Sequence, residues 1–159
     1  MRIAKSQKIA LFVDDDMEFI GMISDIIQHP HFEVRTSYAA DGYQAVDQVI
    51  KTKPDILFID FNLPRANGGQ ILSILKSVKM LSDMRIYFLT AYAEKEILPF
   101  VEGLEFHGVL NKKENLDSEI IKILNELDHS LATWSPTNFL QTASKITNNV
   151  ICPKRAFSL

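Results

Sequence analysis

The chain alternates short apolar segments with longer segments of helical period, and this alternation restricts the fold more than any other feature of the sequence. The five apolar segments are rich in Val, Ile, Leu and Phe, which is typical of strands. They occupy residues 8–14, 32–38, 55–60, 85–90 and 108–111. Most are nearly continuous in apolar residues, as strands covered on both faces are. The weakest segment, 32–38, is expected toward an edge of the sheet.

Apolar residues at three- and four-residue spacing fill the intervals between these segments, which is the pattern of amphipathic helices. The first interval begins after Asp16, a residue type that caps helices, and ends before Pro30. The expected helices lie at about 17–28, 42–52, 68–79, 94–102 and 115–127. Strands that alternate with helices form a parallel sheet between two helical layers. We therefore expect the α/β class, as a doubly wound five-stranded parallel sheet with the flavodoxin-like order 2-1-3-4-5.

Composition and charge argue against several classes of function. Of the 159 residues, 47% are apolar and 23% are charged, the balance of an ordinary globular chain. The part from His129 onward has three basic residues and no acidic one, so it carries +3 and residues 1–128 carry the remaining −6. Neither part has a basic patch, so we expect no nucleic-acid partner. Because no apolar run approaches about 18 residues and the first residues lack a secretion signal, we expect no membrane contact and a cytoplasmic location.

The pattern changes near His129, which divides the chain into a domain at 1–128 and a C-terminal extension at 129–159. Ser135 and Pro136 are typical of a helix start, and apolar residues then recur on one face. One short helix with a frayed end is therefore expected. In one interpretation this helix only covers apolar surface or is partly disordered. In the other it docks on a partner or forms a homodimer.

Acidic side chains end two of the expected strands. Asp14 and Asp15 end the first strand, and Asp60 ends the third. In open α/β sheets the carboxyl ends of the strands line the ligand site, and the expected order makes these two strands neighbours. Carboxylates this close repel each other unless a cation neutralises them, and hard divalent cations prefer oxygen ligands. The sequence therefore predicts a Mg²⁺ site, whereas Asp16 is assigned to capping the following helix.

Two further polar side chains end the fourth and fifth strands. Thr90 closes the segment 85–90, and Lys112 follows the segment 108–111, so a hydroxyl and an ammonium are expected at the same edge. An aspartate can act as a nucleophile toward phosphorus, and the charge on the transferring group is stabilised by a metal, a cation and a hydrogen-bond donor. Thr90, Lys112 and the metal together predict a receptacle for a phosphoryl group.

Four motifs at these positions resemble those of response-regulator receiver domains, the phosphoacceptor modules of two-component signalling. They are FVDDD, FIDFNLPRANGG, FLTAY and GVLNKK, and the resemblance covers about residues 7–128 in order and spacing. It implies that Asp60 is the phosphorylated residue and also a metal ligand. It further implies that Asp15 binds Mg²⁺ directly, that Asp14 assists directly or through water, and that Asn62 contributes its backbone carbonyl.

The resemblance also implies roles for the remaining motif residues. Thr90 would bond the phosphoryl oxygen and move toward it on activation, while Lys112 would pair with the carboxylate and then with the phosphoryl group. Pro64 and Gly68 would shape the adjacent loop. The implied protein is a chemotaxis-regulator-like single-domain receiver, which is not an enzyme but assists its own phosphorylation and dephosphorylation. Its phosphodonor would be a histidine kinase or a phosphotransfer protein, and its output would be contact with a downstream protein target of unknown identity.

Two positions depart from the pattern of that family. Lys113 stands where most members have proline, often with a cis bond, so we expect either a trans bond in a reshaped loop or a strained bond. Val109 stands where members commonly have Tyr or Phe, whose ring reports the movement of the threonine. These departures leave open a receiver-like adaptor that acts without phosphorylation. A Mg²⁺-dependent phosphohydrolase is a weaker alternative, because Asn62 replaces the second acid that would protonate a leaving group.

Overall fold

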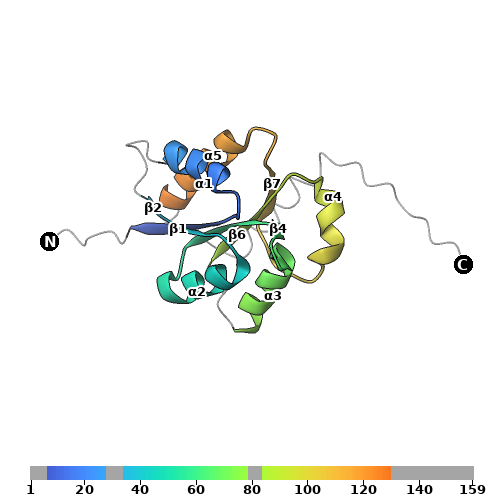
Figure 1. Ribbon diagram of the computed structural model, residues 1–159. Coiled ribbons are helices and arrows are strands. Elements are labelled where there is room, and N and C mark those ends of the chain that lie inside the picture. The colour runs from blue at the N-terminus through green and yellow to red at the C-terminus, as the bar shows by residue number, and fades with distance from the viewer. Residues whose placement is uncertain (1–6, 28–33, 79–83, 130–159) are drawn as a thin grey trace, which may run out of the picture. The chain divides into compact units, whose positions relative to one another are not determined.

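The structure, a computed structural model, describes residues 7–27, 34–78 and 84–129. Its centre is a parallel five-stranded sheet with the order β2-β1-β3-β6-β7 (Figure 1). The strands are β1 (Lys8–Val13), β2 (Val34–Ala39), β3 (Ile56–Asp60), β6 (Arg85–Thr90) and β7 (Gly108–Asn111). Counted among themselves these strands run 2-1-3-4-5, so the predicted fold class and order are confirmed, with the weakest strand at an edge. The short helix predicted in the extension lies outside the described residues.

Helices cover both faces of the sheet, α1 and α5 on one face and α2, α3 and α4 on the other (Figure 1). They are α1 (Met17–Ile27), α2 (Gly42–Thr52), α3 (Gly68–Ser77), α4 (Glu94–Ile97) and α5 (Leu116–His129), and the 3-10 turn η1 (Leu98–Phe100) follows α4. Asp16 caps α1 as predicted, because its carboxylate accepts the N–H groups of Glu18 and Phe19. Within the described part of the chain, no helix is long and apolar enough to span a bilayer.

Each central strand sends alternate side chains into two apolar clusters, one on each face of the sheet. On β1, Phe12 belongs to the cluster beneath α1 and α5, and Leu11 belongs to the cluster beneath α2, α3 and α4. β3 pairs with β1 so that Phe58 lies beside Phe12, and the two rings stack with centroids 4.7 Å apart. Because both faces are covered, β3 is buried along its whole length. This pairing brings the carboxyl ends of β1 and β3 to one edge.

The fourth helix is shorter than the predicted helix at 94–102. α4 ends at Ile97, and the chain continues as the 3-10 turn η1. The reason is Pro99, which has no N–H to donate to an α-helical acceptor and so ends the α-helical pattern. Gly103, with φ of 75°, lies in the left-handed region just beyond this segment, where an α-helix cannot continue.

A short hairpin between β3 and α3 was missed by the sequence analysis. In it, β4 (Asn62–Leu63) pairs antiparallel with β5 (Ala66–Asn67). Pro64 and Arg65 form the turn, and Arg65 has φ of 68°. Proline followed by a residue with positive φ is the pattern of a type II turn, so turn chemistry explains both strands.

Candidate functional site

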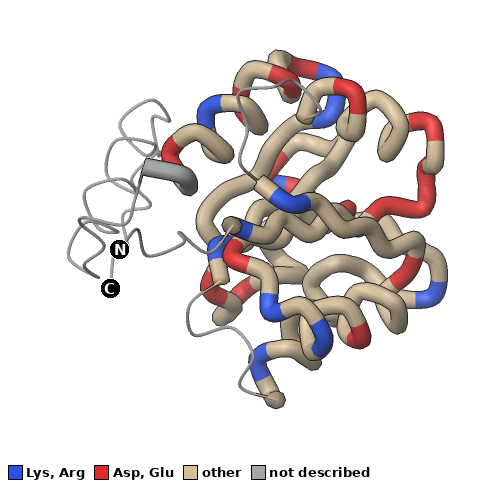
Figure 2. Tube along the Cα trace, turned by 90° about the vertical axis from the view of Figure 1, so that its left-hand side faces the viewer, with Lys and Arg blue, Asp and Glu red and all other residues tan. Residues whose placement is uncertain are grey.

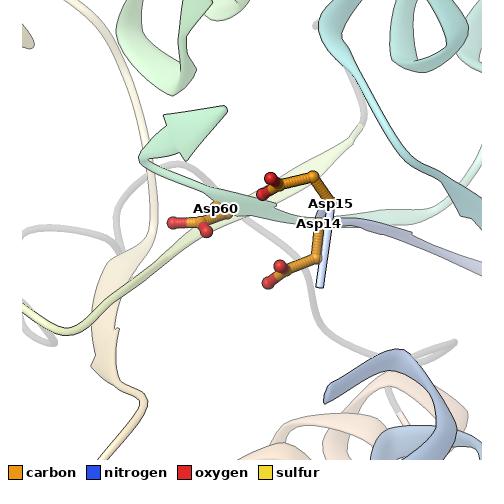
Figure 3. A group of neighbouring side chains, drawn as sticks. All are labelled: Asp14, Asp15 and Asp60. Atoms are coloured by element: carbon orange, nitrogen blue, oxygen red, sulfur yellow. The ribbon is translucent and has the colours of Figure 1, made fainter. Parts of the chain in front are cut away.

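The predicted acidic residues meet at the carboxyl edge of the sheet. Asp14 and Asp15 directly follow β1, and Asp60 is the last residue of the neighbouring strand β3. One carboxylate oxygen from each residue lies within 4.8 Å of those from the other two. Figure 3 shows the three side chains grouped at these strand ends. This spacing fits three oxygen ligands of one divalent cation, so the structure brings together three of the four predicted metal ligands.

Lys112 joins two of these acids. Its Nζ lies 2.6 Å from Asp14 Oδ2 and 2.7 Å from Asp60 Oδ2. Its backbone N–H donates to the carbonyl oxygen of Thr90, which fixes the base of the side chain beside β6. One ammonium therefore faces two buried carboxylates, with the exposed Asp15 carboxylate beside them, and the remaining negative charge is what a divalent cation can neutralise.

Burial affects the ionisation of Asp14 and Lys112, whereas Asp15 is exposed. Asp14 is 1% exposed and Asp60 is 7% exposed. Burial raises the pKa of Asp14 above its ordinary value, and the hydrogen bond and charge of Lys112 offset only part of this effect. Burial works to lower the pKa of Lys112, but the hydrogen bonds and charges of the two acids outweigh it and raise that pKa. Lys112 therefore stays protonated at neutral pH, while ionisation of Asp14 costs free energy that a bound cation would reduce.

The loop after β3 orients the Asp60 carboxylate. The N–H of Asn62 donates to Asp60 Oδ1 at 3.0 Å, while Oδ2 accepts from Lys112. Gly68 begins α3, and a Cβ at this position would lie only 2.9 Å from the backbone oxygen of Asp60. The absence of that Cβ lets α3 approach the end of β3 closely, which is the loop-shaping role expected of Gly68. The use of the Asn62 carbonyl as a metal ligand stays a prediction.

Thr90 lies where the sequence analysis placed it, at the carboxyl end of β6, and it is 1% exposed. Its Oγ1 accepts the N–H of Tyr92 at 3.0 Å, and its carbonyl oxygen accepts the N–H of Lys112. These contacts hold the hydroxyl at the same edge as the acids. The proposed bond from this hydroxyl to a phosphoryl oxygen stays a prediction.

The sequence analysis missed the contribution of Phe19. Its ring lies against the Lys112 ammonium, with Nζ 4.6 Å from the ring centroid. The sequence did indicate that Phe19 lies near the site, because Asp16 starts α1 at the end of β1 and so places the first turn of this helix at the carboxyl edge. The partner of the ring could not be read from the sequence, because Lys112 is distant along the chain.

The loop after β7 shows how the chain accommodates Lys113 where most receiver domains have proline. The described residues contain no cis peptide bond, so the bond between Lys112 and Lys113 is trans. The N–H of Lys113 donates to Asn111 Oδ1 at 2.8 Å, which holds the loop. Val109 packs against the cluster beneath α2, α3 and α4, and Phe106 packs against the same cluster. The phenyl ring nearest to Val109 in sequence, that of Phe106, thus lies against the core.

Charge on the described chain is mixed. Figure 2 shows Lys and Arg positions interspersed with Asp and Glu positions along the tube. The excess negative charge of the site comes from three acids brought together at the ends of β1 and β3.

The fold and the site together define a class: a doubly wound parallel sheet with an acidic group and a lysine at its carboxyl edge. Residues 10–125 match the family described as the response regulator receiver domain. The chain belongs to this family, whose members are signalling modules of two-component systems. The resemblance seen in the sequence is thereby confirmed.

Two curated relatives illustrate the range of this family. Sporulation initiation phosphotransferase F of Bacillus subtilis is 30% identical over 89 residues, which cover 55% of this chain and 68% of that protein. Protein-glutamate methylesterase/protein-glutamine glutaminase 3 of Vibrio cholerae is 33% identical over 100 residues, which cover 62% of this chain and 26% of that protein. The chain therefore spans about a quarter of the length of the methylesterase that it matches.

Solved structures agree on the fold. The chemotaxis response regulator CheY4 of Vibrio cholerae superposes with a TM-score of 0.66 and 22% identity, covering 76% of this chain and 98% of the other. The phosphorylated cyanobacterial phytochrome response regulator RcpA superposes with a TM-score of 0.67 and 22% identity, covering 80% and 98%. At this identity the similarity establishes the arrangement of helices and strands alone.

Proposed function

We propose that this chain is a phosphoacceptor, in which Asp60 receives a phosphoryl group and the protein signals through contact with another protein. The observation that carries the proposal is the group at one sheet edge, where Lys112 joins Asp60 to Asp14 and Asp15 completes a metal-sized set of oxygens. A structural ion pair would need one acid for one lysine. The excess of acid favours a site that holds Mg²⁺.

Phosphoryl transfer follows from these positions. A carboxylate oxygen of Asp60 attacks phosphorus and forms an acyl phosphate, while the bond from phosphorus to the leaving group breaks and the leaving group keeps the electron pair. Bound Mg²⁺, held by Asp14, Asp15, Asp60 and the Asn62 carbonyl, would supply positive charge near the phosphoryl oxygens. Lys112 turns from the carboxylate to a phosphoryl oxygen, and the Thr90 hydroxyl donates to another.

The donor and the target follow from the family. We assign the donor role to a histidine kinase or a phosphotransfer protein, and the name of the Bacillus subtilis relative supports a place in phosphotransfer. The proposed receiver spans 1–128, and whether the extension 129–159 only covers apolar surface or docks on a partner is left to truncation after Asp128. The proposed output is contact with another protein. Phosphorylation adds nearly two negative charges, which biases a two-state equilibrium in the nearby loops and so changes the surface that a partner would meet. On this proposal the chain is not an enzyme, and it acts in the cytoplasm.

Intact mass spectrometry tests the proposal. The full chain is incubated with Mg²⁺ and acetyl phosphate, and the expected result is the addition of one phosphoryl group. Asp60→Asn should abolish the addition. Asp55→Asn is the matched control, because Asp55 lies at the other end of the same strand and should leave the addition intact. Addition that persists in Asp60→Asn would contradict the assignment.

A receiver-like adaptor that needs no phosphate is the second candidate. It is favoured by Val109, which leaves the position of the expected reporting ring without an aromatic side chain. The same experiment separates the two, because an adaptor would show no mass increase in the unmodified chain. It would also bind its partner equally well with and without Mg²⁺ and acetyl phosphate.

A further inference from the structure

We propose that Phe19 is a positioning residue for phosphoryl transfer, because its ring holds the Lys112 ammonium at the place where it joins Asp14 and Asp60. This inference rests on the proposed phosphoacceptor function. It concerns a contact between α1 and the loop after β7, and it assigns a role to a side chain that carries no charge.

The geometry around Nζ of Lys112 is the first observation. Two acids lie at 2.6 and 2.7 Å, and the Phe19 ring centroid lies at 4.6 Å. The face of an aromatic ring carries partial negative charge and attracts a cation, more strongly when water is excluded. The Lys112 side chain is only 18% exposed, so water screens this contact weakly. The ring therefore attracts the Lys112 ammonium and also limits the space in which it can move.

The position of the ring is itself fixed by the acidic segment. Asp16 Oδ1 accepts the N–H of Phe19 at 3.1 Å, and the N–H of Asp16 donates to Asp14 Oδ1 at 3.0 Å. Asp14 Oδ2 in turn pairs with Lys112. These contacts connect Asp14 to Asp16, Asp16 to Phe19, Phe19 to Lys112, and Lys112 back to Asp14. The other side of Phe19 packs on the cluster beneath α1 and α5.

An aromatic ring suits this place better than an aliphatic or acidic side chain. Leucine would fill much of the space, but it would not attract the ammonium. An acid would bind Lys112 strongly and hold it away from a phosphoryl group on Asp60. The ring restrains the flexible lysine side chain without competing for its hydrogen bonds. Lys112 can therefore change partners from carboxylate to phosphoryl oxygen while it keeps the Phe19 contact.

The test compares Phe19→Leu with Phe19→Tyr, which keeps the ring. The rate of phosphorylation is followed by intact mass at saturating Mg²⁺ with acetyl phosphate as donor. Phe19→Leu should slow the reaction about two- to fivefold, the effect of one cation–π contact on a partly buried ammonium. Phe19→Tyr should keep the rate of the unmodified chain. Phe106→Leu is the matched control, because Phe106 is also a half-buried ring but packs on the other face, and its rate should be unchanged.

A second measurement reports the contact directly and does not depend on phosphorylation. In protein with isotope-labelled lysine, the Lys112 ε-methylene protons should show an upfield ring-current shift, assigned by its loss in Lys112→Arg. The shift should vanish in Phe19→Leu and persist in Phe19→Tyr. An unchanged rate in Phe19→Leu, or a tyrosine variant as slow as the leucine variant, would overturn the inference. Absence of phosphorylation in the unmodified chain would instead reject the proposed function, while the lysine spectrum would still test the contact.

Discussion

The two ends of strands β1 and β3 carry similar residues in different proportion. At the amino end, Lys8 Nζ lies 2.7 Å from Asp55 Oδ1, and Asp55 Oδ2 accepts the N–H of Ile9. At the carboxyl end, Lys112 faces Asp14 and Asp60, with Asp15 beside them. The amino ends of the two strands thus have one acid for one lysine, whereas three acids at their carboxyl ends gather with one lysine, Lys112, which follows β7.

This difference separates an ion pair that holds structure from a group that can bind a ligand. The carboxylate of Asp55 has a partner for each oxygen, so it has no need of a further cation. At the carboxyl end two buried acids share one lysine, and burial raises the pKa of Asp14. Charge that the fold leaves unbalanced is available for Mg²⁺, and this end therefore gives up stability for binding.

The largest expected contrast is between the two lysines. Lys112→Met should cost about 3 kcal/mol of unfolding free energy without Mg²⁺, because it leaves two buried acids without a counter-charge. Lys8→Met should cost about 1 kcal/mol, because its partly exposed pair is screened by water. Urea unfolding measures both. Added Mg²⁺ should recover part of the loss in the Lys112 variant and none in the Lys8 variant, and equal losses would remove the distinction between the two ends.

The next contrast uses two glycines. Gly68→Ala should cost about 2 kcal/mol, because the new Cβ would lie 2.9 Å from the backbone oxygen of Asp60. Gly108→Ala, at the amino end of β7, should cost less than about 1 kcal/mol, because its Cβ would lie 3.3 Å from the Tyr87 ring, a side chain that can move. Thermal unfolding measures the stability of both variants. Only Gly68→Ala should also slow phosphorylation, and a normal rate in that variant would show that the close approach does not position Asp60.

A smaller contrast concerns the acids themselves. Asp15→Asn should weaken Mg²⁺ binding at least about tenfold in calorimetric titration, because it removes an oxygen charge from the cation site. Without Mg²⁺ its stability should equal or exceed that of the unmodified chain, since one repelling charge is gone. Asp55→Asn should behave in the opposite way, losing stability while binding Mg²⁺ normally. Unchanged Mg²⁺ affinity in Asp15→Asn would exclude this residue from the metal site.

The smallest expected effect is a pH dependence at the amino end of β7. Burial lowers the pKa of His107, with Arg85 adding to this effect, and Nδ1 accepts the N–H of Ile86 at 3.1 Å. Tyr87 packs its ring beside the imidazole. The folded state therefore binds a proton less readily than the unfolded state, so the contribution of His107 is complete above pH 6.5 and is lost as pH falls.

Urea unfolding checks the direction of this pH dependence. The unmodified chain and His107→Gln are compared at pH 7.5 and pH 5.5, each about one unit from the ordinary histidine pKa. Glutamine keeps an acceptor for the Ile86 N–H but does not titrate in this range. The unmodified chain should lose up to about 1 kcal/mol more than the variant on acidification. Parallel losses in the two proteins would contradict the assignment.

Most of the fold could be predicted because its determinants are local. Short segments rich in strand-forming residues located the five strands, and Asp16 located the start of α1. The error in the fourth helix came from following the apolar spacing past Pro99, although proline cannot donate to the α-helical ladder. The hairpin was missed because its strands have two residues each, too few to show a period.

The site was predicted in part for the same reason. Residues that end parallel strands must share an edge once the strand order is known, so Asp14, Asp15 and Asp60 could be grouped from the sequence. The sharing of Lys112 between Asp14 and Asp60 could not be read in this way. It depends on the reach and direction of one side chain across the ends of several strands.

Neighbouring residues in the chain carried enough information to assign the α/β class and the kind of chemistry at the strand ends, since apolar runs, caps and terminal residues act over a few positions. The balance of charge within the group, and the ring of Phe19 against Lys112, arose only from packing of distant segments. Asp60 and Lys112 are 52 positions apart. Their separation of 2.7 Å is set by the sheet and the helices around it, because no local preference acts over such a distance.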